Sequence, residues 1–226
     1  MRYLNKIVFI NSAAIRYSEV QLDGNIHLIG TQGVGKSTIL RAILFFYNAD
    51  TQRLGIPVEK KSYQDYYFPY ADSSIIYEVA REDGWFTVLS YKTMNRICYR
   101  FIASPYRPDL FIDEEGAPYP SDRIRSVLDK NGIKYSGAIS TYEEYRNILY
   151  GNSDNKRDYS CYSLMESGSY QNIIRTIQNV LLNSRLEADY IKQTIITSLN
   201  EADSVIDLSR YRSHLSGFEA QLNDIG

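Results

Sequence analysis

The chain has 226 residues, a formal net charge of −2 at pH 7 and 44% hydrophobic residues, which is ordinary for a soluble globular protein. No apolar run approaches the roughly 20 residues of a membrane span, so no membrane association is expected. Two cysteines and two histidines without metal-ligand spacing argue against a structural zinc site and fit a reducing cytoplasm. Because the net charge is near zero, any nucleic-acid contact must come from a local patch.

The first 29 residues predict three strands. Residues 3–10 and 17–22 look like a strand pair, and Asp23-Gly24 favours a turn into a third strand over residues 25–29. The apolar stretch at the very start is interrupted by polar residues. We therefore expect a strand there and not a secretion signal.

Residues 30–38, GTQGVGKST, fit the phosphate-loop pattern G-x-x-x-x-G-K-[ST]. In such a loop successive backbone N–H groups hold the α- and β-phosphates, and glycines let the backbone approach them closely. Lys36 is expected to reach the β- and γ-phosphates, and the Ser37 hydroxyl to bind Mg²⁺. An apolar helix over residues 39–46 follows and adds its positive end to the same anion site. The sequence therefore predicts a nucleoside triphosphate site formed by Gly30, Thr31, Gln32, Gly33, Val34, Gly35, Lys36, Ser37 and Thr38.

A long segment without clear periodicity, residues 48–72, separates this helix from the next strands. Loops of this length are uncommon unless they have a function. Its cations Arg53, Lys60 and Lys61 could contact a nucleic-acid backbone, although a charge cluster on a loop is more often simply solvated.

The middle of the chain predicts antiparallel strands and two helices. Asp83-Gly84 is a strong hairpin signal between the first two strands. Ser121 is the expected N-cap of the first helix, and Thr141 with Glu144 has the capping-box arrangement for the second. The expected elements are strands over residues 74–80, 85–91, 97–103 and 110–113, and helices over residues 121–131 and 141–150.

Two short patterns raise the alternative of a GTP-binding switch. Asp113 ends the apolar stretch LFID, and DEEG at 113–116 fits the Asp-x-x-Gly pattern of GTPases. Residues Asn155-Lys156-Arg157-Asp158 fit the guanine-reading Asn-Lys-x-Asp pattern. That pattern should end a buried strand, but it follows an entirely polar stretch. The GTPase therefore stays the less favoured interpretation.

From residue 170 the chain predicts helices almost to its end. Near the end, apolar residues are spaced 3, 4, 3, 4 and 3 apart, which indicates a coiled-coil seam, or else an amphipathic helix packed on its own domain. Residues 215–219, LSGFE, are close to the signature of ABC-type ATPases. They lack its second glycine, however, and chance resemblance on a coil is the better account. The seam residues are Leu208, Tyr211, Leu215, Phe218, Leu222 and Ile225.

The segment from Ile7 to Ala49 resembles the N-terminal head segment of SMC-like ATPases, the structural-maintenance-of-chromosomes group. These proteins begin with a strand, a short basic and aromatic turn, a second strand, a phosphate loop ending GKST and an apolar helix. Residues 160–199 are similar to the later part of the same half-head in the MukB/JetC-like branch. The order of elements is shared along nearly the whole chain, but the phosphate loop is the one highly specific motif.

This resemblance implies an α/β fold, the N-terminal lobe of a P-loop NTPase head of the ABC/SMC type. It implies a mixed sheet with an antiparallel strand subdomain, and C-terminal helices that lead into a coiled coil. The lobe would span residues 1–200 and the start of the coiled coil residues 201–226. Lys36 would stabilise charge on the γ-phosphate, and Arg16 and Tyr17 lie where the family has the turn that flanks the adenine. The family's glutamine loop has no clear equivalent, since only Glu166 or Gln171 could take its place.

The same resemblance implies a function for the half-head. It would bind ATP and Mg²⁺, join the C-terminal lobe of the same head, and pair with a second head around the nucleotides. Head engagement would be coupled to DNA binding in chromosome organisation, repair or defence against plasmids and phages. The chain lacks a convincing catalytic carboxylate, so little hydrolysis is expected from it alone. A module that uses nucleotide only as a structural ligand is the third interpretation.

Overall fold

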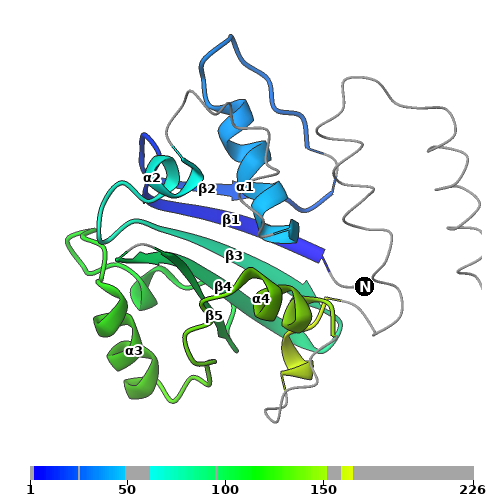
Figure 1. Ribbon diagram of the computed structural model, residues 1–226, viewed down its shortest axis with the longest axis vertical. Coiled ribbons are helices and arrows are strands. Elements are labelled where there is room, and N and C mark those ends of the chain that lie inside the picture. Colours follow the sequence, from blue (N-terminus) through cyan, green and yellow to red (C-terminus); the bar gives the residue numbers. More distant parts are fainter. Residues whose placement is uncertain (1–2, 25, 49–61, 95, 152–158, 165–226) are drawn as a thin grey trace, which may run out of the picture. The chain divides into compact units, whose positions relative to one another are not determined.

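Five strands form one sheet in the order β2-β1-β3-β4-β5 (Figure 1). The computed structural model describes residues 3–24, 26–48, 62–94, 96–151 and 159–164. These residues belong to one unit, residues 1–178, and the second unit, residues 179–226, lies outside the described part of the chain. The strands are β1 (Tyr3–Ser12), β2 (Ile15–Gln21), β3 (Ser74–Arg81), β4 (Gly84–Thr93) and β5 (Arg96–Ile102). The helices are α1 (Lys36–Asn48), α2 (Tyr63–Tyr67), α3 (Ser121–Lys130) and α4 (Tyr142–Leu149).

All strand pairs in the described sheet are antiparallel. The β3–β4 hairpin closes at the predicted Asp83-Gly84 turn, where Arg81 pairs with Gly84. Gly84 has a φ of +143°, a backbone conformation that glycine adopts without a side-chain clash. The strand β1 of the first hairpin also pairs with β3, which lies about 70 residues later in the chain. Five of the predicted strands, β1 to β5, are therefore confirmed, while the pairing of β1 with β3 is a finding of the structure.

The helices α1, α2 and α4 cover one face of the sheet, which we call the α1 face. Aromatic side chains fill the space between these layers. Phe46 of α1 lies 5.0 Å from Tyr77 of β3 between ring centroids, and Tyr145 of α4 lies 4.3 Å from Tyr99 of β5. Many of the tyrosines of the chain thus lie in the core.

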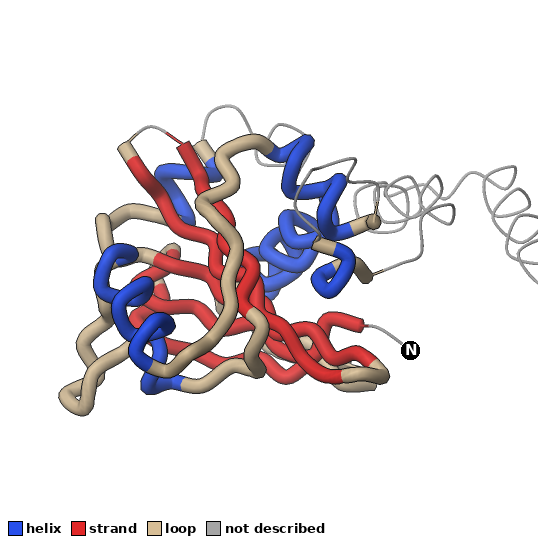
Figure 2. Tube along the Cα trace, turned by 90° about the horizontal axis from the view of Figure 1, so that it is seen from below, coloured by secondary structure: helices blue, strands red, loops and turns tan. Residues whose placement is uncertain are grey.

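The opposite face, the α3 face, packs against α3 and the segment that precedes it. In Figure 2 α3 lies apart from the other helices. Ile124 and Leu128 of α3 join a buried apolar cluster with Ile76 of β3 and Leu89 of β4. Successive strand residues point to opposite faces, and both faces of the central strands are covered, so all residues of β3 except Arg81 are buried.

The expected mixed sheet is not present in the described residues. The strand predicted over residues 25–29 does not form, because residues 26–35 lie outside every helix and strand. The side chains of Ile26 and Ile29 are 41% and 91% exposed, so neither is buried by a neighbouring strand. Backbone groups in a strand need a partner strand to satisfy them, and none is present here. The strands predicted as a separate antiparallel subdomain also share one sheet with β1 and β2.

Two local predictions in the later part of the chain are wrong. Residues 110–113 do not form a strand, because Pro108 starts a short 3₁₀ turn at Pro108–Leu110 and only a single bridge joins Ile112 to Pro118. The helix α3 is capped by Pro120 and not by Ser121, which is its first helical residue. The cap of α4 is as predicted, since the Thr141 hydroxyl accepts a hydrogen bond from the Glu144 N–H (3.3 Å).

Candidate functional site

The phosphate-loop motif runs directly into the first turn of α1. The helix begins at Lys36, and the N–H groups of Thr38 and Ile39 both donate to the Gly35 carbonyl, at 3.0 and 3.1 Å. Gly33 and Gly35 have φ values of +91° and +95°, which lie in the left-handed region that favours glycine. The first N–H groups of α1 have no carbonyl partner within the helix, and the positive end of its dipole lies at the same place.

The loop folds back on itself, and Lys36 closes it. A side chain at Gly30 would bring its Cβ to 2.7 Å from Cγ2 of Val34, so this position has no room for one. The Lys36 ammonium donates to the carbonyls of Gly30 and Thr31, at 2.5 and 2.7 Å. The only formal charge within the motif is thereby held against its own backbone, at the end of the helix that favours anions.

A pocket of about 510 Å³ opens at this loop. Among the described residues that line it, none is acidic, and one comes from outside the motif. This residue is Tyr66 of α2, which sequence reasoning missed because α2 lies in the segment without clear periodicity. Thr31, Gly30 and Val34 belong to the loop but do not line the pocket. The lining residues are Gln32, Gly33, Gly35, Lys36, Ser37, Thr38 and Tyr66.

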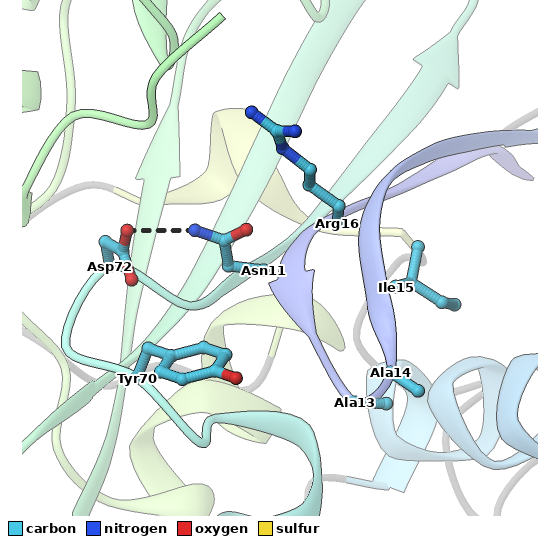
Figure 3. Close-up of a pocket in the computed structure, with 7 residues that line it drawn as sticks. All are labelled: Asn11, Ala13, Ala14, Ile15, Arg16, Tyr70 and Asp72. Carbon is cyan, nitrogen blue, oxygen red and sulfur yellow. Dashed lines mark hydrogen bonds between the residues drawn. The ribbon is translucent and has the colours of Figure 1, made fainter.

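Arg16 lies in a second pocket, of about 430 Å³, at the tip of the β1–β2 hairpin (Figure 3). The Asn11 side-chain amide donates to the Asp72 carboxylate across it (2.9 Å). Asn11 and Ala13 both have positive φ values, +44° and +54°, which is uncommon for residues with a side chain. The structure therefore brings Arg16 together with Asp72 and Tyr70, and not with the phosphate loop itself.

The helix α2 and the residues after it join the two pockets. Tyr66 lines the first pocket and Tyr70 lines the second. Four residues span at most about 14 Å, so the Cα atoms of these two tyrosines lie within that distance. The helix is fixed to α1 by the Tyr67 hydroxyl, which donates to the Thr38 carbonyl (2.7 Å), and by the Tyr63 ring, stacked 4.5 Å from Phe45 between centroids.

Further tyrosine hydroxyls hold α1 along its length. Tyr77 donates to the Ala42 carbonyl (3.0 Å), Tyr145 to Phe46 and Tyr150 to Tyr47 (both 2.6 Å). The last four carbonyls of a helix have no partner inside it, so Tyr145 and Tyr150 satisfy two such groups at the C-terminal end of α1. Burial raises the pKa of Tyr77 and Tyr145 well above that of an exposed tyrosine, and both remain donors.

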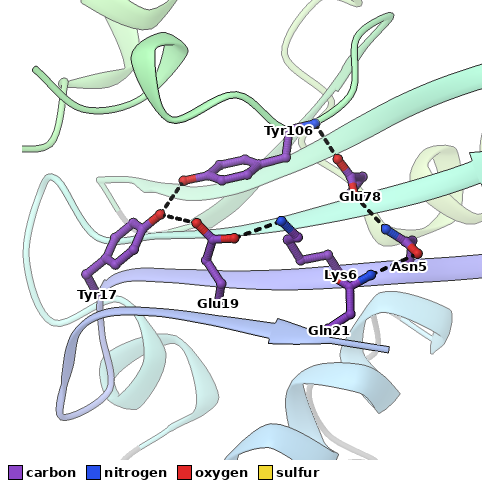
Figure 4. Close-up of polar contacts among 7 residues, drawn as sticks. All are labelled: Asn5, Lys6, Tyr17, Glu19, Gln21, Glu78 and Tyr106. Atoms are coloured by element: carbon purple, nitrogen blue, oxygen red, sulfur yellow. Dashed lines mark hydrogen bonds and ion pairs between the residues drawn. The ribbon is translucent and has the colours of Figure 1, made fainter. Parts of the chain in front are cut away.

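Tyr17, the neighbour of Arg16, belongs to a polar network (Figure 4). Its hydroxyl donates to the Glu19 carboxylate (2.5 Å) and pairs with the Tyr106 hydroxyl (3.0 Å). Lys6 donates to the other oxygen of Glu19 at 2.8 Å. Partial burial of Glu19 opposes its ionisation, but the hydrogen bonds from Lys6 and Tyr17 outweigh this and lower its pKa. Tyr17 thus has structural partners, and the described contacts give it no role at the phosphate loop.

Of the residues of the GTPase alternative, only Asp113 and the DEEG stretch at 113–116 lie in the described part of the chain. The Asp113 carboxylate accepts hydrogen bonds from the N–H groups of Glu115 and Ala117, at 3.1 and 2.7 Å, and so stabilises a turn. This turn follows Phe111, which is part of the cluster on the α3 face, whereas the phosphate loop precedes a helix on the α1 face. Other predicted features lie outside the described residues: Arg53, Lys60, Lys61, Asn155–Asp158, Glu166, Gln171, and the seam and LSGFE motif within residues 208–225.

Among the described residues, no group of three or more His, Cys, Asp or Glu side chains is close enough to hold a metal ion. Cys98 is buried and Cys161 exposed, and neither forms a disulfide. No described helix combines the length and apolar character needed to cross a membrane.

Comparison with known proteins gives one family. No curated protein matches the chain. A family model described as "Protein of unknown function (DUF3584)" matches residues 12–219, which include the phosphate loop, the strands β2 to β5 and the helices α1 to α4 of the described part. The match covers most of the chain, and the chain therefore belongs to this DUF3584 family.

Proposed function

We propose that this chain is the ATP-binding half of an SMC-like ATPase head, catalytically incomplete without a second, C-terminal half. The observation that carries the proposal is the loop from Gly30 to Thr38. It combines glycines in left-handed conformations, the Lys36 ammonium and the N-terminal end of a 13-residue helix around one pocket. These are the elements that bind a triphosphate: inward N–H groups, a cation and a helix dipole.

In this proposal the motif residues bind the phosphates and the metal ion. Lys36 would exchange its bonds to the Gly30 and Thr31 carbonyls for phosphate oxygens, and its charge would stabilise the γ-phosphate. Ser37 lines the pocket, and its hydroxyl oxygen is a suitable ligand for Mg²⁺. Because the described lining residues include no acid, Mg²⁺ would depend on Ser37 and the nucleotide's own phosphates for its ligands.

The second pocket would take the base and ribose. It offers a guanidinium on Arg16, a hydrogen-bonding pair on Asn11 and Asp72, and the 62% exposed ring of Tyr70. The aromatic ring provides a surface for stacking, and the polar groups can read a base edge. The separation of at most about 14 Å between the Cα atoms of Tyr66 and Tyr70 keeps the two pockets close together.

The incompleteness of the site also supports the proposal. The segment that precedes the loop is apolar at Ile26 and Ile29 but pairs with no strand among the described residues, and the described pocket residues supply no carboxylate to position water. A second lobe would pair with this segment and bring the carboxylate. Further partners would be a second head, engaged through the bound ATP, and DNA, as part of chromosome organisation, repair or anti-plasmid and anti-phage defence.

The proposal is tested first by calorimetric titration with ATP and GTP in the presence of Mg²⁺. We expect binding of ATP that is lost in Lys36→Ala, with an unchanged unfolding midpoint, because Lys36 is only half-buried and is not part of the core. Lys134→Ala is the matched control, since Lys134 is an exposed lysine on the other side of the fold, beside β5. A strong preference for GTP that disappears in Asp158→Ala would favour the GTPase switch instead.

A second measurement separates an ATPase from a module that only binds nucleotide. The chain is combined with the C-terminal half encoded by its natural gene, and ATP turnover is measured with and without DNA. We expect low turnover from the chain alone and a clear increase with the partner half. Absence of turnover in the reconstituted pair would favour the binding module. Fast turnover by the isolated chain would contradict the proposal that the chain is catalytically incomplete on its own.

A further inference from the structure

The hydroxyl of Tyr66 lies at the phosphate-loop pocket and is held there by the loop's last residue. Its oxygen is 3.1 Å from Oγ1 of Thr38, and both residues line the pocket. Tyr66 is 37% exposed, whereas Thr38 is buried, so the phenol is the part of this pair that is open to the pocket.

The position of Tyr66 is fixed by the residue next to it. Tyr67 is fully buried and donates its hydroxyl to the carbonyl of Thr38, so two successive tyrosines contact the same residue of α1. The two rings meet edge to face, 4.9 Å apart between centroids and at 81°. The Tyr66 hydroxyl is therefore held in place before any ligand binds, which lowers the entropic cost of using it.

A count of protons shows what the pair can offer. Two hydroxyl groups carry two protons, and the hydrogen bond between them uses one. When the Thr38 hydroxyl donates to the Tyr66 oxygen, the Tyr66 proton can be donated to an acceptor in the pocket. The pocket also has the Lys36 ammonium and the positive end of α1, so the acceptor it favours is an anionic oxygen.

We propose that Tyr66 is a phosphate ligand of this site, and that its hydroxyl, oriented by Thr38, donates a hydrogen bond to an oxygen of the bound polyphosphate. This inference rests on the proposed nucleotide function and adds to it a residue that lies outside the phosphate-loop motif. Tyr66 and Tyr67 connect α2 to the start of α1, so the proposed ligand lies on an element that is fixed to that helix.

The test compares Tyr66→Phe with the wild type by titration with Mg²⁺-ATP, Mg²⁺-GTP and inorganic tripolyphosphate. A hydrogen bond to a charged group corresponds to roughly a tenfold change in affinity or more. We expect the affinity for tripolyphosphate and for whichever nucleotide binds to fall by about that factor, because the contact is to phosphate and not to the base. Tyr3→Phe is the matched control, since Tyr3 is also 37% exposed but lies at the start of β1.

Further variants distinguish a ligand from a structural contact. Thr38→Val removes the orienting hydroxyl, and in this background we expect Tyr66→Phe to cost less than it does alone. The unfolding midpoint without ligand should stay within about 1 °C for Tyr66→Phe, because the bond that it loses is partly exposed. A lower midpoint with unchanged tripolyphosphate affinity would make Tyr66 a structural residue.

The outcomes separate this inference from the proposed function. If Lys36→Ala abolishes binding and Tyr66→Phe binds like the wild type, the nucleotide site stands and the role of Tyr66 is refuted. If the affinity falls for one nucleotide but not for tripolyphosphate, Tyr66 contacts the base and the phosphate contact is refuted. If the wild-type chain binds none of the three ligands, both the inference and the proposed function fail.

Discussion

Tyr145→Phe tests whether the tyrosine hydroxyls that reach α1 stabilise the fold. Tyr145 is 1% exposed, and its hydroxyl donates to the Phe46 carbonyl at 2.6 Å. This carbonyl is in the last turn of α1 and has no intrahelical partner, so the substitution leaves a buried acceptor unsatisfied. Such a loss costs about 1 to 3 kcal/mol of the free energy of unfolding. For a chain of this size, a loss of about 2 kcal/mol lowers the thermal unfolding midpoint by roughly 4 to 8 °C.

The measurement is thermal and urea unfolding followed by circular dichroism, with Tyr142→Phe as the control. Tyr142 is the first residue of the same helix, and its side chain is 44% exposed. Its variant should unfold within about 0.5 kcal/mol of the wild type, as surface substitutions usually do. If Tyr145→Phe were as neutral as Tyr142→Phe, the carbonyl of Phe46 would have another partner and the reasoning about the end of α1 would be wrong.

Two other predictions concern buried polar groups. Burial raises the pKa of several core tyrosines, so the folded chain keeps phenol protons that the unfolded chain releases above pH ~10. Below that pH this contribution is fully present. Above it the free energy of unfolding falls by about 1.4 kcal/mol per pH unit for each such tyrosine, until the folded-state pKa is reached. The buried tyrosines Tyr63, Tyr77 and Tyr145 should therefore ionise only together with loss of the helical signal, as a second rise in tyrosinate absorbance after that of the surface tyrosines. Full tyrosinate absorbance in a chain that keeps its helical signal would contradict this. Glu78→Gln should cost about 1 to 3 kcal/mol in urea unfolding, because the buried Glu78 carboxylate accepts from both the Asn5 amide and the Tyr106 N–H (Figure 4). Equal stability of Glu78→Gln and the exposed control Glu115→Gln would rule this out.

Local signals in the sequence predicted most of the elements. The turn residues Asp83-Gly84 predicted the β3–β4 hairpin, and the GKST motif predicted the start of α1. The capping residue Thr141 gave the start of α4. These features depend on neighbours within a few residues. The pairing of β1 with β3 depends on residues about 70 positions apart, and no local pattern encodes it.

The candidate site was predicted in the same uneven way. The loop residues from Gln32 to Thr38 follow from the motif, whereas Tyr66 lies on a helix of five residues, too short to show a helical period. The prediction of a strand before the loop was wrong for a related reason. Its apolar pattern at Ile26 and Ile29 is a real signal, but a strand also needs a partner, and the described residues provide none.

The hydrogen bonds that fix α1 suggest why a half-site can bind nucleotide without its second half. The helix is fixed by the hydroxyls of Tyr67 near its start, Tyr77 in its middle and Tyr145 near its end. These come from α2, from the sheet and from α4, so three separate elements hold α1 through hydrogen bonds that do not involve the segment before the loop. In the proposed function, the position of the helix dipole and of Lys36 is therefore set before a second lobe joins. Affinity for nucleotide would then reside in this chain, and the partner half would change the rate of hydrolysis more than the strength of binding.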